Sequence, residues 1–247
     1  MAKHPRIALV TGANKGLGFE TCRQLGRQGI IVLLAARNRA LGEGATAQLR
    51  EEGLDVHFVV LDVTNSDQIH EARLQMEKHY GHLDILVNNA GTISPEETLF
   101  GNSTATIAPE ILRRTFDVNF FGLVELTQAL LPLLKKSPAG RIVNVASILG
   151  SLTVHSDPAS DFAAIKPFAY DASKTAVNQF TIHLAAALAD TPIKVNSAHP
   201  GWVRTDLGGN EAPMEVAEGA KTAIWLATLG PDGPTGGFFH GTERLPW

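Results

Sequence analysis

The sequence predicts an α/β protein built on a doubly wound parallel sheet of about seven strands flanked by helices. Three observations lead to this fold class. Short apolar runs rich in Val, Ile and Leu recur along the chain, longer segments with helical periodicity separate them, and most of the runs are apolar on both faces. Strands of this kind that alternate with helices are typical of a parallel sheet covered by helices on both sides.

The expected elements follow one another along the chain. Strands are predicted at 7–10, 31–36, 56–61, 83–87, 141–146, 193–198 and 236–240, because each is a short β-rich apolar run. Helices are predicted at about 17–28, 39–52, 66–80, 110–135 and 170–189. The last of these has an apolar face made of Ala176, Val177, Phe180, Leu184 and Leu188. The Pro- and Gly-rich stretch 230–237 is expected to be a loop. Because no linker or repeat divides the chain, residues 1–247 are expected to form a single domain.

Composition and charge favour a protein that handles small molecules. Hydrophobic residues make up 44% of the 247 positions, and the net charge of −4 provides no positive field for nucleic acid or an anionic membrane. Cys22 is the single cysteine, which excludes an intrachain disulfide and a cysteine-based zinc cluster. The longest apolar run, 30–36, is far shorter than a membrane span, and the sequence has no metal-ligand motif. We expect a cytoplasmic protein without a metal, nucleic-acid or membrane partner.

A glycine loop directly after the first predicted strand indicates a dinucleotide site. The segment 11–18 has the spacing Gly-x-x-x-Gly-x-Gly, and such glycines let the backbone approach a pyrophosphate at the N-terminus of the next helix. An NAD site needs an acidic residue about 20 positions further on, but Ala36 and Arg37 occupy that place. Lys15 and Arg37 are two cations that can converge on a 2′-phosphate. The sequence therefore favours NADP(H) over NAD; the alternative is a plain turn with ordinary surface charges.

Tyr170, Lys174 and Ser147 form the predicted catalytic group. Tyr170 and Lys174 are four positions apart, so they share one face of the predicted helix. A phenol titrates near pH 10, and we expect the neighbouring ammonium of Lys174 to lower the pKa of Tyr170 toward neutrality. Ser147 follows the fifth predicted strand, at the sheet edge where ligands bind. Its hydroxyl can donate a hydrogen bond to a substrate oxygen; the alternative is a serine that satisfies a loop amide.

Together these motifs resemble the short-chain dehydrogenase/reductase family, which has a Rossmann-type fold. The matching segments extend from Arg6 to the last predicted strand. The resemblance implies that Tyr170 is the general acid or base, that Lys174 lowers its pKa and holds the nicotinamide ribose, and that Ser147 orients the substrate oxygen. It also implies that Asn119 anchors a water of the proton relay. It assigns cofactor binding to Gly12, Asn14, Lys15, Gly16, Leu17, Gly18, Arg37, Asn38, Asp62, Val63, Asn89, Ala90, Gly91, Tyr170, Lys174, Pro200, Gly201, Val203 and Thr205.

The spacing between Ser147 and Tyr170 departs from the common pattern of this family. The two residues are 23 positions apart, whereas about a dozen is usual, so an inserted loop is predicted at about 151–168. Carbonyl reductases of the family, including monomeric ones, carry insertions here that can cover the active site or obstruct tetramer formation. The sequence leaves a monomer and a homo-oligomer open, with a slight preference for a monomer or dimer. His155 and Asp157 are interpreted as loop filler rather than catalytic groups.

A second variable segment, about 205–218, resembles the substrate-binding loop of the family. We predict that the apolar residues Ile148, Trp202, Leu207 and Met214 form walls of the substrate pocket. The predicted function is NADPH-dependent reduction of a ketone or aldehyde to an alcohol by hydride transfer. Two alternatives stay open: a 3-oxoacyl reductase or steroid- or sugar-type alcohol dehydrogenase of the same family, and a non-catalytic NADPH-binding sensor.

Overall fold

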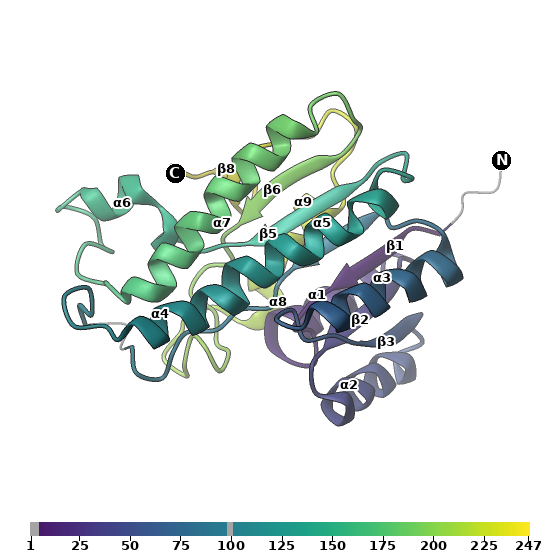
Figure 1. Cartoon of the computed structure of the whole chain (residues 1–247), viewed down its shortest axis with the longest axis horizontal. Coiled ribbons are helices and arrows are strands. Elements are labelled where there is room, and N and C mark those ends of the chain that lie inside the picture. The colour runs from purple at the N-terminus through teal and green to yellow at the C-terminus, as the bar shows by residue number, and fades with distance from the viewer. Residues whose placement is uncertain (1–4, 98–100) are drawn as a thin grey trace.

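The computed structural model describes residues 5–97 and 101–247, and in this part of the chain it contains an eight-stranded sheet (Figure 1). The strand order is β3-β2-β1-β4-β5-β6-β7-β8. The strands are β1 Ile7–Val10, β2 Ile31–Ala36, β3 Val56–Val60, β4 Ile85–Asn88, β5 Arg141–Val145, β6 Lys194–Ala198, β7 Phe238–His240 and β8 Glu243–Arg244. All seven predicted strands are present. The eighth is a two-residue strand antiparallel to β7, too short to leave an apolar pattern in the sequence.

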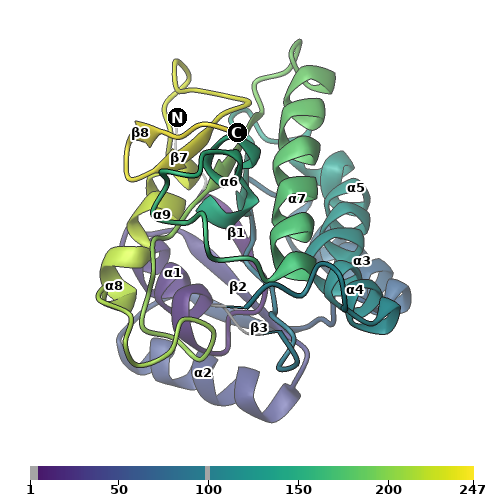
Figure 2. The same cartoon turned by 90° about the vertical axis from the view of Figure 1, so that its left-hand side faces the viewer.

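Helices cover both faces of the sheet (Figure 2). One face carries α1 Gly16–Gly26, α2 Arg39–Glu51, α8 Val216–Gly219 and α9 Lys221–Ala227; the other carries α3 Ser66–Tyr80, α5 Gly122–Leu134 and α7 Phe168–Ala187. Each face of the sheet has its own apolar core: the first core lies on the side of α1, α2 and α9, and the second core lies on the side of α3, α5 and α7. Successive strand residues point to opposite faces, so Ala8 and Val10 belong to the first core, whereas Ile7 and Leu9 belong to the second. The strands are apolar throughout because both of their faces are buried.

The strand order reverses between β1 and β4, and this reversal places the site. The chain adds β2 and β3 on one side of β1, and then β4, β5 and β6 on the other. At such a switch point the loops diverge to opposite faces and leave a crevice at the carboxyl ends of the strands. The Thr11 hydroxyl forms the floor of this crevice by accepting from the amides of Asn89 and Ala90 at 3.0 and 2.9 Å. Gly12, at φ +63°, permits this approach, because a Cβ there would lie 2.9 Å from the Ala90 Cα.

The long helix predicted at 110–135 is present and contains a π turn. It consists of α4 Pro109–Phe116, the π-helical η1 Asp117–Phe121 and α5. Among the described residues, the stretch Pro109–Leu134 is the one helix that is long and apolar enough to qualify as a candidate membrane span. Four leucines of α5 are buried against the sheet in the second core. Packing within the fold therefore explains its apolar character.

The inserted loop at 151–168 is packed rather than open. It follows the short η2 Ile148–Gly150 and begins with α6 Leu152–Ser156, neither of which was predicted. Ser151 caps α6 by accepting from the Val154 amide at 3.2 Å. Val154, Phe162 and Ile165 pack against a third apolar cluster that includes Tyr170. The helices α8 and α9, also unpredicted, fill the segment between β6 and β7.

Candidate active site

Tyr170 and Lys174 face one cavity at the carboxyl ends of β4, β5 and β6. The cavity has a volume of about 240 Å³, and both side chains are buried. The Lys174 Nζ donates to the carbonyl oxygen of Val145 at 2.8 Å and lies 5.6 Å from the centre of the Tyr170 ring. The helical spacing in the sequence therefore brings the phenol and the ammonium to the same wall.

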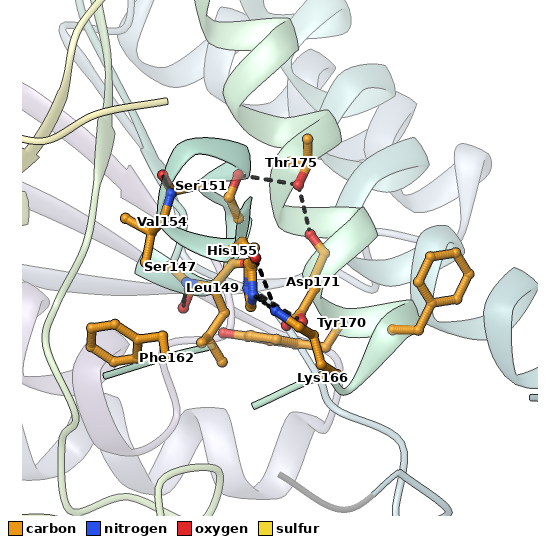
Figure 3. A network of polar contacts seen from close by, with 12 residues as sticks. Ser147, Leu149, Ser151, Val154, His155, Phe162, Lys166, Tyr170, Asp171 and Thr175 are labelled. Carbon is orange, nitrogen blue, oxygen red and sulfur yellow. Dashed lines mark hydrogen bonds and ion pairs between the residues drawn. The ribbon is translucent and has the colours of Figure 1, made fainter. Parts of the chain in front are cut away.

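Ser147 lies directly after β5 and completes the polar part of this cavity. Its hydroxyl accepts from the Leu149 amide at 3.2 Å, which caps η2. The hydroxyl is also near enough to the phenol to lower the pKa of Tyr170, and Figure 3 shows the Tyr170 ring extending from α7 toward Ser147 and Phe162. Ser147 therefore satisfies a loop amide, as one of the two interpretations predicts, and its donation to a substrate oxygen stays a prediction.

The titration of Tyr170 differs from the expectation. Burial raises the pKa of Tyr170 to about 12, against the opposing effect of the hydrogen bond to Ser147. The carboxyl group of Asp171 raises it further. Burial also lowers the pKa of Lys174 to about 8. The expected shift of the phenol toward neutrality is therefore wrong for this chain on its own, because desolvation is the largest effect on the pKa of Tyr170.

Asn119 lies in the π turn and holds neighbouring segments together. Its Nδ2 donates to the Thr92 carbonyl at 2.9 Å and to the Ser173 hydroxyl at 3.0 Å, and its Oδ1 accepts from the Thr92 amide at 2.8 Å. A Cβ on Gly91 would stand 3.5 Å from this Oδ1 and 3.4 Å from the Lys174 Nζ. Asn119 is thus close to Lys174, but its side chain does not line either cavity described here.

A larger cavity of about 630 Å³ adjoins the first along the carboxyl edge of the sheet. The two share Leu17, Asn89, Gly91, Thr205 and Leu207 in their walls. Most of the predicted cofactor residues line one or both cavities: Gly12, Asn14, Lys15, Gly16, Leu17, Gly18, Arg37, Asp62, Val63, Asn89, Ala90, Gly91, Tyr170, Lys174, Pro200, Gly201, Val203 and Thr205. Asn38 does not line them; its side chain accepts from the Leu41 amide at 3.0 Å and caps α2.

The larger cavity has the chemistry of a site for a phosphorylated dinucleotide. Helix α1 begins there without a side-chain cap and without an acidic residue in its first turn. Its free amides and the positive end of its dipole therefore suit an anion. Lys15 and Arg37 line the same cavity, and Lys15 forms an ion pair with Asp206 from the loop after β6. These residues fit NADP(H), with its pyrophosphate at the helix end and a 2′-phosphate near the cations.

The substrate end of the first cavity is mostly apolar. Of the four predicted wall residues, Ile148, Trp202 and Leu207 line it. Met214 does not line the cavity. It packs against Gly201, since a Cβ placed on Gly201 would lie 2.8 Å from the Met214 side chain. The prediction missed the wall residues Leu149, Phe162, Ile165 and His199. Phe162 and Ile165 are apolar residues inside the inserted loop, and their apolarity was the one sequence signal that pointed to them.

A polar network fastens the inserted loop to α7 (Figure 3). The His155 Nε2 lies 2.8 Å from the Leu149 carbonyl oxygen, and its Nδ1 lies 2.6 Å from the Lys166 Nζ. A carbonyl only accepts and an ammonium only donates, so the ring is neutral with its proton on Nε2. Burial, helped by the charge of Lys166, lowers the pKa of His155 accordingly. His155 therefore connects segments of the loop, and interpreting it as loop filler understated this structural role. Asp157 stabilises a turn by accepting from the Ala159 amide at 2.9 Å.

Asp171 is the partner of this network on α7. Its Oδ2 lies 3.4 Å from the His155 Nε2. Burial raises the pKa of Asp171 to about 8, and the nearby charge of Glu97 adds to that effect while Lys166 opposes it. The inserted loop thus contacts the helix that carries Tyr170 through a mostly buried pair of His155 and Asp171 rather than through an exposed ion pair.

Comparisons with known proteins show what this chain is similar to. The family model described as short chain dehydrogenase matches residues 6–216. Carbonyl reductase (NADPH) 1 of Mus musculus is 34% identical over 287 aligned positions, which cover all of both chains. The (-)-isopiperitenone reductase of Mentha piperita is 33% identical over 99% of each chain. Among solved structures, the carbonyl reductase Sniffer of D. melanogaster has a TM-score of 0.84 and 30% identity, covering 99% of this chain and 100% of that one.

Proposed function

Because this chain belongs to the short-chain dehydrogenase family and uses NADP(H), we propose that it reduces ketones or aldehydes to alcohols, with Tyr170 as the proton donor. Its reaction class is that of an NADP-dependent oxidoreductase acting on C=O and CH–OH groups. Relatives of similar identity have names that refer to different compounds, so the proposal concerns the reaction and not one substrate.

The observation that carries the proposal is the grouping of Tyr170, Ser147 and Lys174 on one mostly apolar cavity. This cavity adjoins the cation-lined cavity that fits NADP(H). An apolar pocket excludes water and strengthens the few polar contacts made inside it. A carbonyl group bound there has the hydroxyl groups of Ser147 and Tyr170 available to its oxygen.

Each of the three residues has a distinct task. Bound NADPH supplies the hydride to the carbonyl carbon. The Tyr170 hydroxyl donates its proton to the oxygen as charge develops on it, and the Ser147 hydroxyl donates a hydrogen bond to the same oxygen. Lys174 is held by the Val145 carbonyl beside the phenol, where its charge stabilises the tyrosinate left after proton transfer. Asn119 supports this wall through its bonds to Thr92 and Ser173.

At neutral pH Tyr170 is in the protonation state that reduction requires. A phenol with a pKa of about 12 is protonated under these conditions and carries the proton to be donated. The reverse reaction requires the tyrosinate, which burial disfavours. Alcohol oxidation is therefore expected to accelerate as the pH rises through the alkaline range, while ketone reduction does not.

The test compares the wild type with Tyr170→Phe, following oxidation of NADPH and of NADH. Aryl ketones, α-diketones, aldehydes and short 3-oxoesters serve as substrates. NADPH should be oxidised well ahead of NADH, and the variant should lose about 10²- to 10⁴-fold in kcat with its NADPH affinity retained. Tyr80→Phe is the matched control, because Tyr80 is the other tyrosine of the chain and lies at the end of α3. Undiminished turnover in Tyr170→Phe contradicts the proposal, and tight NADPH binding without turnover of any substrate favours a sensor.

A further inference from the structure

The first turn of α7 has no cap of its own. The preceding residue is Pro167, which forms no side-chain cap. The first amides of any helix lack carbonyl partners within the helix, and unsatisfied ends fray. Tyr170 is the third residue of α7, so the position of its hydroxyl depends on this turn.

Two side chains from the segment between β4 and α4 supply the missing acceptors. The Phe168 amide donates to the Ser103 hydroxyl at 3.3 Å. The Ala169 amide donates to the Glu97 Oε1 at 2.9 Å, and the Tyr170 amide donates to the Glu97 Oε2 at 3.2 Å. The Ser103 hydroxyl in turn donates to the Glu97 Oε1 at 2.9 Å. The whole first turn is therefore capped by residues that are distant in sequence.

The environment of Glu97 explains how a carboxylate is accommodated in the interior. Its side chain is buried, with 6% of the residue exposed. Burying a carboxylate is unfavourable unless hydrogen bonds compensate, and here it accepts three while it faces the positive end of the α7 dipole. Glu97 does not line either cavity, so it has no contact with the place of the cofactor or of the substrate.

We propose that Glu97 is a positioning residue for the reaction: its carboxylate caps α7 from outside the helix and so holds Tyr170 where it can donate its proton. This inference rests on the proposed function, because Glu97 acts through Tyr170. Lys174 lies one turn further into the helix and is fixed independently by the Val145 carbonyl. Loss of the cap should therefore impair proton donation and leave the binding of NADPH intact.

The experiment compares Glu97→Ala and Glu97→Gln with Glu96→Ala. Glu96 is the sequence neighbour and is exposed; it pairs with Arg114 at 3.0 Å and accepts from the Ser94 hydroxyl, and it takes part in none of the bonds that cap α7. Steady-state kcat and KM, the Kd of NADPH by fluorescence titration, and hydrogen exchange of the α7 amides are measured well below the melting temperature of each variant. Hydrogen exchange reports on the cap itself and does not depend on turnover.

A positioning role predicts a specific pattern across these readouts. Glu97→Ala should lower kcat about tenfold or more, with the NADPH Kd changed less than about twofold and faster exchange at Ala169 and Tyr170. Glu97→Gln should be intermediate, because its amide oxygen can still accept from Ala169 while its NH₂ group cannot accept from Tyr170. Glu96→Ala should match the wild type in every measurement.

Two results overturn the inference. One is a Glu97→Ala variant with wild-type kcat or with unchanged exchange in the first turn of α7. The other is a parallel loss of kcat and NADPH affinity, which indicates a general loss of structure. If the wild type itself reduces no carbonyl compound, the proposed function fails on its own. Faster exchange at Ala169 and Tyr170 in Glu97→Ala then still supports the cap, and unchanged exchange still refutes it.

Discussion

Replacing Arg37 by alanine is expected to weaken the binding of NADPH and leave the binding of NADH unchanged. Arg37 lies directly after β2, is exposed, and lines the larger cavity together with Lys15. The two cofactors differ by the 2′-phosphate alone, so a residue that recognises this group affects only one of them. Introducing an acid at Ala36 is a poorer test, because that side chain is buried in the first core and a carboxylate there would destabilise the fold.

The expected size of the effect follows from the contacts of the two cations. A hydrogen bond between charged groups contributes about 1.5–3 kcal/mol, so Arg37→Ala should raise the NADPH Kd about 10- to 100-fold. Lys15 already forms an ion pair with Asp206, so binding the 2′-phosphate would replace that ion pair with another and add little net attraction. Lys15→Ala should therefore have a smaller effect than Arg37→Ala. Asp206→Asn should tighten NADPH binding slightly, because it removes a weak exposed competitor.

The assay is a fluorescence titration of each variant with both cofactors at low and moderate salt. The differences should shrink as salt rises, since exposed charges are screened. Arg39→Ala is the matched control, because Arg39 is exposed on α2 and pairs with Glu43 at 3.3 Å outside the cavity. An equal change for NADH and NADPH in Arg37→Ala, or no change for NADPH, refutes the assignment of Arg37. A larger loss of NADPH affinity in Lys15→Ala than in Arg37→Ala contradicts the argument that Asp206 already occupies Lys15.

Three further predictions concern stability and the pocket. The pKa of Asp171 is about 8 in the folded protein and about 4 in the unfolded chain. The stability that this group contributes is therefore fully present below pH 4 and is lost as the pH rises through 8. The melting temperature should fall between pH 5 and pH 8 in the wild type, and it should fall less in Asp171→Asn. Gly42→Ala places a Cβ 2.0 Å from the Phe58 ring and should lower the free energy of unfolding by about 1–3 kcal/mol. Gly44→Ala, with open space in the same helix, should raise it by about 0.5–1 kcal/mol, and denaturant titration measures both. Phe162→Ala removes a wall of the substrate cavity, so the ratio of kcat/KM for bulky over small ketones should rise; an unchanged ratio contradicts the placement of that side chain.

Local signals in the sequence were sufficient for the sheet and for most of the motif residues. The strands β1 to β7 could be predicted because both faces of the sheet are buried, which leaves unbroken apolar runs. Ser147 and the glycine loop follow strands directly, and the pair Tyr170 and Lys174 is set by the helical repeat. In these cases the position in space follows from the position along one element.

Most of what sequence reasoning misplaced depends on contacts between distant segments. Asn38 is the exception: it follows the strand that carries the cofactor signal, but its side chain caps α2 by accepting from the Leu41 amide, which is a local contact. Met214 belongs to the variable loop, yet it packs behind Gly201 rather than into the pocket. The pKa of Tyr170 depends on how much of the fold covers the phenol, and Glu97 reaches α7 across 73 positions of sequence. No local pattern encodes such contacts.

The first turn of α7 shows how the enzyme accommodates an inserted loop without displacing its proposed proton donor. Ser147 and Tyr170 are 23 positions apart, yet both line the same cavity. The insertion leaves from η2 and is tied back to the helix by His155 and Asp171, while Glu97 and Ser103 hold the same turn from the segment after β4. The turn is thus fixed from both sides, and neither anchor uses a side chain of the catalytic group. The loop can therefore change in length and in wall residues such as Phe162, which alters the substrate pocket, while Ser147 and Tyr170 keep their places on the same cavity.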